Sequence, residues 1–272
     1  MDPNKFGVQI TTLDQMKFGL GDYQDKFSIQ SIAKVFAVCL AFKTQGEVIW
    51  KRVGVEPSGT AFNSLLQLEK DHGIPRNPFI NAGAMVIADI LISQFDNPKE
   101  EMLKFINSLS NNKDIKYSPV IAASEKSAGY RNIALCNFLK SLGNIENNPE
   151  EVLDFYFAVS SLEASCEELS SLFLFMANNG RTLHDNTEIL TSSQSKRINA
   201  LMQTCGFYDE SGEFAFKVGL PGKSGVGGGT IAIFPQQYAI TAWSPKLNEK
   251  GNSYKSLMLL EEFTTLSEKS IF

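Results

Sequence analysis

Strand-like patterns at both ends of the chain, on either side of a long helical stretch, limit the fold more than any other feature. Short runs of alternating or β-branched side chains are typical of strands. These runs cover residues 6–13, 16–20, 213–220, 224–234 and 238–243. The connections between neighbouring runs are too short for parallel crossovers, so we expect antiparallel pairing. The two ends are therefore predicted to form one α+β unit.

Helical periodicity dominates the middle of the chain, where apolar residues recur at spacings of three and four. The predicted helices, including one near each end, cover residues 31–44, 61–70, 82–94, 98–109, 131–142, 149–159, 165–178, 192–203 and 253–266. We predict a sheet domain made of residues 1–53 and 204–272, with a mostly helical domain of residues 54–203 inserted into it. With 272 residues, the chain is long enough to bury a sizeable core.

The composition excludes several classes of partner. Apolar residues make up 43% and charged residues 20% of the chain, and the formal charge is -5. No basic stripe is present, which argues against nucleic acid and anionic membranes as partners. The first five residues lack the apolar core of a signal peptide, and the apolar run 35–42 is too short to cross a bilayer. We therefore expect a cytoplasmic protein.

The four cysteines, Cys39, Cys136, Cys166 and Cys205, are widely separated along the chain. None belongs to a C-x-x-C pair, so the sequence supports neither a metal site nor a redox motif. Cys39 and Cys166 fall within apolar helical patterns. We expect free, buried thiols in a reducing compartment rather than disulfides.

Ser31 and Lys34 form a Ser-x-x-Lys motif at the predicted start of helix 31–44. Residues three apart lie on one face of a helix, so the lysine amine can reach the serine hydroxyl. A lysine desolvated enough to be neutral can take the serine proton and create a nucleophile. Free backbone N–H groups at a helix start favour the developing negative charge. Taken alone, however, the motif is more often a helix-terminal serine and a solvated lysine.

A second lysine motif, Lys223-Ser224-Gly225, precedes the glycine-rich residues 226–229. It could be a polar turn, or it could bring positive charge to a site beside a strand that a substrate approaches closely. The order Ser-x-x-Lys, helical insert, Lys-Ser-Gly resembles the serine penicillin-binding proteins and β-lactamases. Their third motif, Ser-Asp-Asn or Tyr-x-Asn, is not found in the expected region. This difference argues against a penicillin-recognising enzyme.

Longer motifs resemble the serine-dependent glutaminase family, nearly from end to end of the chain. They are Glu56-Pro57-Ser58-Gly59 with Phe62-Asn63, Pro75 to Ala84, Ser124-Glu125 with Arg131-Asn132-Ile133-Ala134, Asp154 to Phe157, Cys205 to Asp209, Val218 to Pro221, and Trp243-Ser244-Pro245. Each long motif is far more specific than Ser-x-x-Lys. The resemblance implies hydrolysis of L-glutamine to L-glutamate and ammonia on a β-lactamase/DD-peptidase-like α+β fold, with no metal or organic cofactor.

The resemblance also implies roles for single residues. Ser31 matches the family's nucleophile, Lys34 its general base, and Tyr208 a tyrosine that binds substrate and transfers protons. The family's substrate-binding positions match Gln30, Ser31, Asn81, Glu125, Asn132, Tyr156, Tyr208 and the backbone N–H of Val226. Without the resemblance, Asn81 would be interpreted as a helix cap, Tyr156 as a core residue and Glu125 as a solvated carboxylate.

Family members usually begin with some tens of residues more, including an Asp-Tyr-Ile-Pro-like segment whose tyrosine touches substrate. This sequence starts after that point, at Met1, so one wall of the pocket is expected to be absent. The alternatives are therefore a weakly active or inactive homologue acting as a binding protein, and a penicillin-recognising serine hydrolase. The resemblance further implies a homodimer or homotetramer. Selectivity between glutamine and asparagine stays open.

Overall fold

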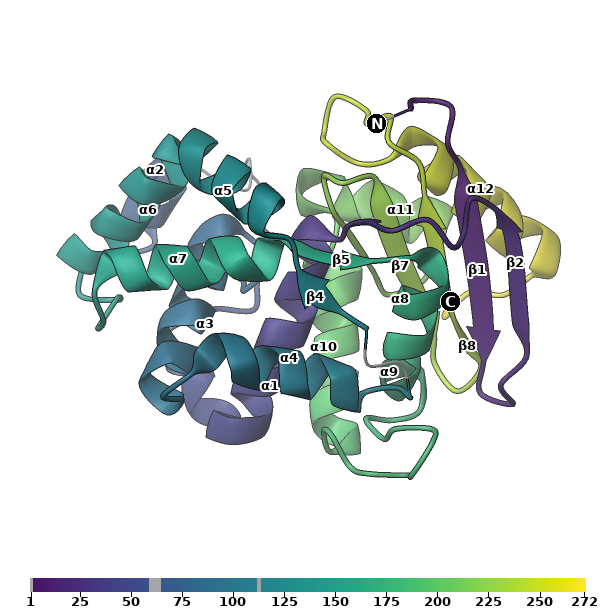
Figure 1. Cartoon of the computed structure of the whole chain (residues 1–272), viewed down its shortest axis with the longest axis horizontal. Coiled ribbons are helices and arrows are strands. Elements are labelled where there is room, and N and C mark those ends of the chain that lie inside the picture. Colours follow the sequence, from purple (N-terminus) through teal and green to yellow (C-terminus); the bar gives the residue numbers. More distant parts are fainter. Residues whose placement is uncertain (1, 59–64, 112–113) are drawn as a thin grey trace.

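The computed structural model describes residues 2–58, 65–111 and 114–272. The predicted helix 61–70 is described only in part, as α2 (Leu65–Lys70). The motif residues Gly59, Phe62 and Asn63 lie outside the described residues. Figure 1 shows a mostly helical part beside a part that contains the sheet. The predicted α+β class is thus confirmed.

A five-stranded antiparallel sheet joins the two ends of the chain. Its strands, in spatial order, are β2 (Lys17–Gly21), β1 (Gly7–Thr12), β8 (Tyr238–Trp243), β7 (Gly229–Phe234) and β6 (Gly222–Ser224). β1 pairs with β8, so that Val8 lies opposite Ala242. Strands from near the two termini therefore lie side by side (Figure 1), and the predicted antiparallel pairing is confirmed.

The two faces of this sheet pack against different helices, because side chains alternate across each strand. One face is covered by α8 (Cys166–Leu172) and α9 (Leu174–Ala177), and the other by α11 (Ser211–Lys217) and α12 (Tyr254–Ser267). On β7, Ile231 and Ile233 belong to the core cluster that includes α8 and α9. Ala232, between them, belongs to the second cluster, with α11 and α12. The strands other than edge strand β2 are therefore largely buried on both faces.

Helix α1 (Ala33–Gln45) runs through the centre of the molecule. All ten residues 33–42 are buried, and the helix packs against α3 and α7. A helix that is apolar on every side belongs in the interior. The other helices of this part are α3 (Asn81–Gln94), α4 (Pro98–Ser108), α5 (Pro119–Ala128), α6 (Tyr130–Ser141), α7 (Pro149–Ser160) and α10 (Ser192–Cys205). The burial of α1 places the Ser-x-x-Lys motif at the middle of the fold.

Three short strands form a second antiparallel sheet that the sequence does not predict. In spatial order they are β3 (Phe27–Ser28), β5 (Leu162–Ala164) and β4 (Lys116–Tyr117). Strands of two or three residues are too short to show alternation. Directly after β3, the N–H of Ile29 donates to the Leu162 carbonyl at 2.9 Å. This small sheet therefore fixes the path of the chain into α1.

Two secondary-structure predictions fail, and one helix is missed. The strand predicted over residues 224–234 is interrupted, because residues 225–228 form the turn between β6 and β7. The strand predicted over residues 213–220 is wrong, because most of this segment is helix α11. Phe214 and Val218 are buried four residues apart, whereas Phe216 between them is 90% exposed, which is a helical period. Helix α5 is missed, because none of its ten residues, all of them described, is buried. A helix without a buried face leaves no apolar periodicity to detect.

The division into a sheet domain (1–53 and 204–272) and a helical domain (54–203) stays a prediction. Helix α8, from the predicted helical domain, packs on β1 and β8, while α1, from the predicted sheet domain, packs on α3 and α7. One hydrophobic cluster contains residues of both parts. The two parts therefore share a core.

Two expectations about the chain as a whole can be compared with the structure. The four cysteines are free and buried, as predicted. Across residues 2–58, 65–111 and 114–272, no helix combines the length and apolar character needed to span a bilayer.

Candidate active site

Ser31 and Lys34 lie where the small sheet leads into helix α1. Ser31 is the middle residue of a 3₁₀ turn (Gln30–Ile32), and α1 begins directly afterwards at Ala33. The predicted helix start is confirmed to within one turn. Lys34 is 4% exposed, whereas Ser31 is only partly buried. The lysine, rather than the serine, is therefore the more desolvated member of the pair.

Two acceptors hold the Lys34 amine. Its Nζ donates to the backbone oxygen of Phe79 at 3.0 Å and to Asn81 Oδ1 at 2.7 Å. Burial lowers the pKa of Lys34 to about 7, and the negative charge of Glu125 opposes this shift. A neutral amine has two N–H donors, and these two acceptors use both of them. The remaining lone pair is then available to accept a proton.

Asn81 connects Lys34 to a further helix. It is the first residue of α3, and its Nδ2 donates to Asn132 Oδ1 on α6 at 2.9 Å. The interpretation of Asn81 as a helix cap is not supported, because Ile80 is the N-cap residue of α3 and the Asn81 side chain instead bonds to Lys34 and Asn132. The Asn81 amide is thus oriented by the site, with its oxygen toward Lys34.

Tyr208 follows α10 and lies in an uncommon backbone conformation. Its φ of 59° is left-handed, which is infrequent for a residue other than glycine and is often found at functional sites. The residue is 6% exposed, and its hydroxyl is hydrogen-bonded to the Ser31 hydroxyl. Burial raises the pKa of Tyr208 to about 12, and the bond to Ser31 acts in the opposite direction. Tyr208 therefore stays protonated at neutral pH and has a proton to donate.

Glu125 lies on α5 and is held by Gln30. Gln30 Nε2 donates to Glu125 Oε1 at 3.1 Å, and the Gln30 backbone is left-handed with a φ of 48°. Burial raises the pKa of Tyr156, and the neighbouring Tyr208 and Glu125 raise it further. Glu125 also acts on the pKa of Lys34. The carboxylate thus lies close to the residues around Ser31.

Val226 lies in the turn between β6 and β7, and this turn packs closely on the residues that lead into α1. A Cβ on Gly225 would lie 2.4 Å from the Ile29 oxygen, and a Cβ on Gly227 would lie 2.0 Å from the Ser28 oxygen. Glycine permits this approach because it has no side chain. The two glycines therefore bring the backbone of Val226 next to the 3₁₀ turn.

Lys223 is a second buried lysine and lies against the ring of Tyr208. Its Nζ is 4.2 Å from the ring centroid and donates to the carbonyls of Gly206 at 2.9 Å and Ser224 at 2.7 Å. Burial lowers the pKa of Lys223 well below its ordinary value, and the charge of Lys34 lowers it further. This environment favours a neutral amine, whereas the sequence suggested a positive charge here.

The structure brings the predicted residues together in pairs. Hydrogen bonds or close charges link Ser31 with Tyr208, Lys34 with Asn81, Asn81 with Asn132, Gln30 with Glu125, and Glu125 with Tyr156. The Phe79 carbonyl is an unpredicted member, since a backbone acceptor has no sequence signal. Lys223 is not among the predicted site residues, although its motif pointed to the site and its amine lies against the Tyr208 ring. Within the described part of the chain, no three His, Cys, Asp or Glu side chains are grouped to hold a metal ion.

Comparison with known proteins decides the family. The family model described as Glutaminase matches residues 1–272. The chain belongs to the glutaminase family. The glutaminase of Christiangramia forsetii is 55% identical over 272 residues, which are 100% of this chain and 90% of that protein. The glutaminase of Saccharophagus degradans is 54% identical over 272 residues, or 100% of this chain and 89% of that protein.

Solved glutaminase structures have the same fold as this glutaminase-family chain. A probable glutaminase, ybaS, superposes with a TM-score of 0.95 at 30% identity, over 100% of this chain and 88% of that one. A second solved structure is the covalent complex of the Bacillus subtilis glutaminase YbgJ with 5-oxo-L-norleucine, formed by reaction with 6-diazo-5-oxo-L-norleucine. It superposes with a TM-score of 0.88 at 31% identity, over 100% of this chain and 90% of that one. The predicted family and its β-lactamase-like fold are confirmed.

Proposed function

We propose that this chain hydrolyses L-glutamine to L-glutamate and ammonia through a covalent acyl-enzyme on Ser31. The observation that carries the proposal is the buried Lys34 amine, whose two N–H groups have acceptors and whose pKa is about 7. Such an amine can accept the proton of a serine hydroxyl at neutral pH. Membership of the glutaminase family and the 55% identical glutaminase support the substrate.

In the first step, Ser31 Oγ attacks the side-chain amide carbon of glutamine, and its proton passes to Lys34, with Tyr208 as a relay. As the new C–O bond forms, an electron pair of the carbonyl moves onto its oxygen. The backbone N–H groups of Ser31 and Val226 donate to this oxyanion. Losing one such donor typically costs ~3 kcal/mol of transition-state stabilisation.

In the second step, the tetrahedral intermediate collapses and the C–N bond breaks. Tyr208 gives its proton to the leaving nitrogen and takes one back from Lys34, so that ammonia departs. Water then attacks the γ-glutamyl ester, and its proton returns through the same groups to Ser31 Oγ. The pKa of about 12 supports this donor role, because Tyr208 still carries its proton when the nitrogen needs one.

Polar groups from the helical part hold the amino-acid end of the substrate. Glu125, with Gln30 at 3.1 Å, offers a carboxylate to the substrate ammonium. Asn81, Asn132 and Tyr156 offer amide and hydroxyl groups to the substrate carboxylate. Neutral donors achieve this at a lower desolvation cost than additional charged groups.

We also propose that the protein acts in the cytoplasm as a homodimer or homotetramer. The four free thiols support a reducing compartment. Met16, Phe18 and Leu20, at or beside edge strand β2, are 50%, 57% and 67% exposed. Apolar side chains on an exposed sheet edge favour association with another chain. Light scattering after size exclusion measures the oligomeric state.

The experiment is ammonia release from L-glutamine, with L-asparagine as the competing substrate, by the wild-type protein and by Ser31→Ala. We expect turnover of glutamine and a loss of at least about 10⁴-fold in the variant, because the nucleophile is removed. A Ser31→Ala protein with full turnover would contradict the mechanism.

The same proteins separate the alternative functions. Acylation of Ser31 by a labelled β-lactam, without glutamine turnover, would replace the proposal by a penicillin-recognising hydrolase. Calorimetric binding of glutamine without turnover would indicate a binding protein instead.

A further inference from the structure

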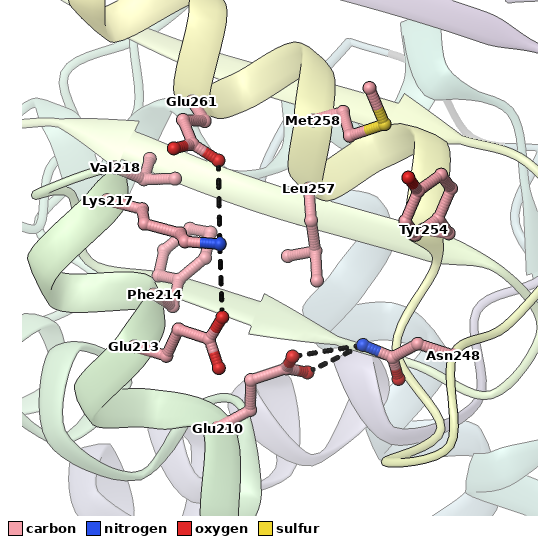
Figure 2. A pocket seen from close by; sticks show the side chains of 10 residues that line it. All are labelled: Glu210, Glu213, Phe214, Lys217, Val218, Asn248, Tyr254, Leu257, Met258 and Glu261. Atoms are coloured by element: carbon pink, nitrogen blue, oxygen red, sulfur yellow. Dashed lines mark hydrogen bonds and ion pairs between the residues drawn. The ribbon is translucent and has the colours of Figure 1, made fainter.

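Glu210 is a buried carboxylate two residues after Tyr208, on the same 3₁₀ turn (Tyr208–Glu210). It is 7% exposed. Its two oxygens each accept from Asn248 Nδ2 at 3.0 Å, and Oε2 also accepts from Asn252 Nδ2. Figure 2 shows Glu210 directed at Asn248 across one end of a pocket of about 250 Å³. A buried carboxylate is costly unless its hydrogen bonds are satisfied, so these bonds are essential to its position.

The two asparagines belong to the Asn248 loop, defined as residues Ser244–Ser253, which joins β8 to α12. Asn248 Oδ1 accepts the N–H groups of Lys250 and Asn252, both at 3.0 Å. The Asn248 N–H donates to the Asn252 carbonyl at 2.7 Å. These bonds close the loop on itself, so Glu210 contacts one compact unit.

The Asn248 loop also packs on the turn that carries Val226. The N–H of Ser244 donates to the Gly228 carbonyl at 3.1 Å. A Cβ added to Gly251 would lie 3.7 Å from Val226 Cγ1, so the loop passes close to the Val226 side chain. Glu210 is therefore connected to Tyr208 through its own turn and to Val226 through this loop.

We propose that Glu210 is a positioning residue that sets Tyr208 and Val226 relative to each other. The inference rests on the proposed function, in which Tyr208 protonates the leaving nitrogen and the Val226 N–H stabilises the oxyanion. Both groups act on the same tetrahedral intermediate. A misplacement of about 1 Å in such a site can cost on the order of 10²-fold in rate. The residues proposed to hold the amino-acid end lie on other elements, so we expect this contact to affect kcat more than KM.

Glu210→Gln tests the inference with almost no change in shape. The amide keeps one acceptor but presents an NH₂ group to the donors of Asn248 and Asn252. We expect kcat for glutamine to fall on the order of tenfold to a hundredfold, while KM changes by less than about threefold. Glu261→Gln is the matched control, because Glu261 lines the same pocket but pairs with Lys217 at 3.8 Å (Figure 2). Its kcat should stay within about twofold.

Rescue separates positioning from simple loss of a charge. Combining Glu210→Gln with Asn248→Asp exchanges donor and acceptor across the contact, since the new amide can donate to the new carboxylate. The Oδ1 atom of residue 248, which accepts the N–H groups of Lys250 and Asn252, remains an acceptor. We expect kcat to recover at least about half of the lost factor on a logarithmic scale, with KM unchanged. If Glu210→Gln does not fold, Asn248→Ser removes the two bonds that Asn248 donates to Glu210, from the partly exposed side, and should also lower kcat.

Three results would overturn the inference. They are a wild-type kcat in folded Glu210→Gln or Asn248→Ser, a loss that appears only as a raised KM, and a double variant no better than Glu210→Gln alone. Failure of the proposed function has a different signature. In that case the wild-type protein releases no ammonia from glutamine, or Ser31→Ala retains turnover.

Discussion

At the scale of residues, two buried lysines beside one tyrosine decide the chemistry that the site can support. The Nζ atoms of Lys34 and Lys223 lie 5.8 Å and 4.2 Å from the ring centroid of Tyr208. Burial lowers the pKa of both lysines, but Glu125 opposes the shift only at Lys34, and the charge of Lys34 acts on Lys223. Two such neighbours are not easily protonated together. Lys34 is therefore the amine that can gain a proton near pH 7.

The first prediction at this scale concerns pH. We expect kcat/KM to increase with pH through an apparent pKa near that of Lys34, about 7, because in the proposed mechanism only the neutral amine accepts the Ser31 proton. Below this value the rate should fall about tenfold for each pH unit. Initial rates at low glutamine concentration measure the profile, with tryptophan fluorescence to check that the protein stays folded. A flat profile in folded protein down to about pH 5 would identify a base other than Lys34.

At the scale of elements, glycines decide how closely the turn between β6 and β7 approaches the start of α1. Gly228 in this turn has a φ of 91°, which L-residues rarely adopt. Gly225 and Gly227 instead provide space, because a Cβ at either position would meet the backbone of the residues before Ser31. Backbone atoms cannot move aside as a flexible side chain can. The position of Val226 therefore depends on these glycines.

Gly227→Ala should move this turn away from Ser31, because the new Cβ would lie 2.0 Å from the Ser28 oxygen. We expect kcat to fall on the order of 10²-fold, since the Val226 N–H would no longer reach the oxyanion. Gly212→Ala on α11 is the control, because a Cβ there has no neighbour within 4 Å. That variant should keep its kcat and gain up to about 1 kcal/mol in unfolding free energy. Equal kcat values for the two variants would exclude a role for the close approach.

At the scale of the whole molecule, Trp243 contacts both sheets and the turn beside the site. It ends β8, where it lies opposite Gly7 on one side and Gly229 on the other. Its ring is parallel to that of Phe27 on β3, with centroids 5.0 Å apart and an angle of 5°. Its Nε1 donates to the Gly227 carbonyl at 3.1 Å. One side chain thus joins the large sheet, the small sheet and the turn beside Ser31.

Trp243→Ala should lower the unfolding free energy by about 3–5 kcal/mol, because the cavity left by a fully buried indole cannot close completely. Urea denaturation followed by circular dichroism measures the change. Phe216→Ala is the control, since Phe216 is 90% exposed, and it should stay within about 0.5 kcal/mol of the wild type. If both variants unfold at the wild-type urea concentration, the two sheets are not coupled through Trp243.

The fold class, most of the long elements and the family can be predicted from the amino-acid sequence alone. Strand β8 spans the predicted residues 238–243, and α7 (Pro149–Ser160) differs from its prediction by one residue at its end. Apolar periodicity depends only on neighbours along the chain, so a single sequence contains it. The motif order is equally local, and it led to the family that the comparisons confirm. The individual site roles of Ser31, Lys34 and Tyr208 stay predictions.

Three features depend on tertiary packing and are not predictable from local patterns. They are the helix within residues 213–220, helix α5, and the short strands of the second sheet. The lowered pKa of Lys34 depends on tertiary packing as well. Its amine donates to the side-chain oxygen of Asn81, which is 47 residues away in the sequence. Desolvation and hydrogen-bond partners come from residues that are distant in the chain and close in space. A local pattern therefore shows that a lysine follows a serine, but not that the lysine is buried enough to act as a base.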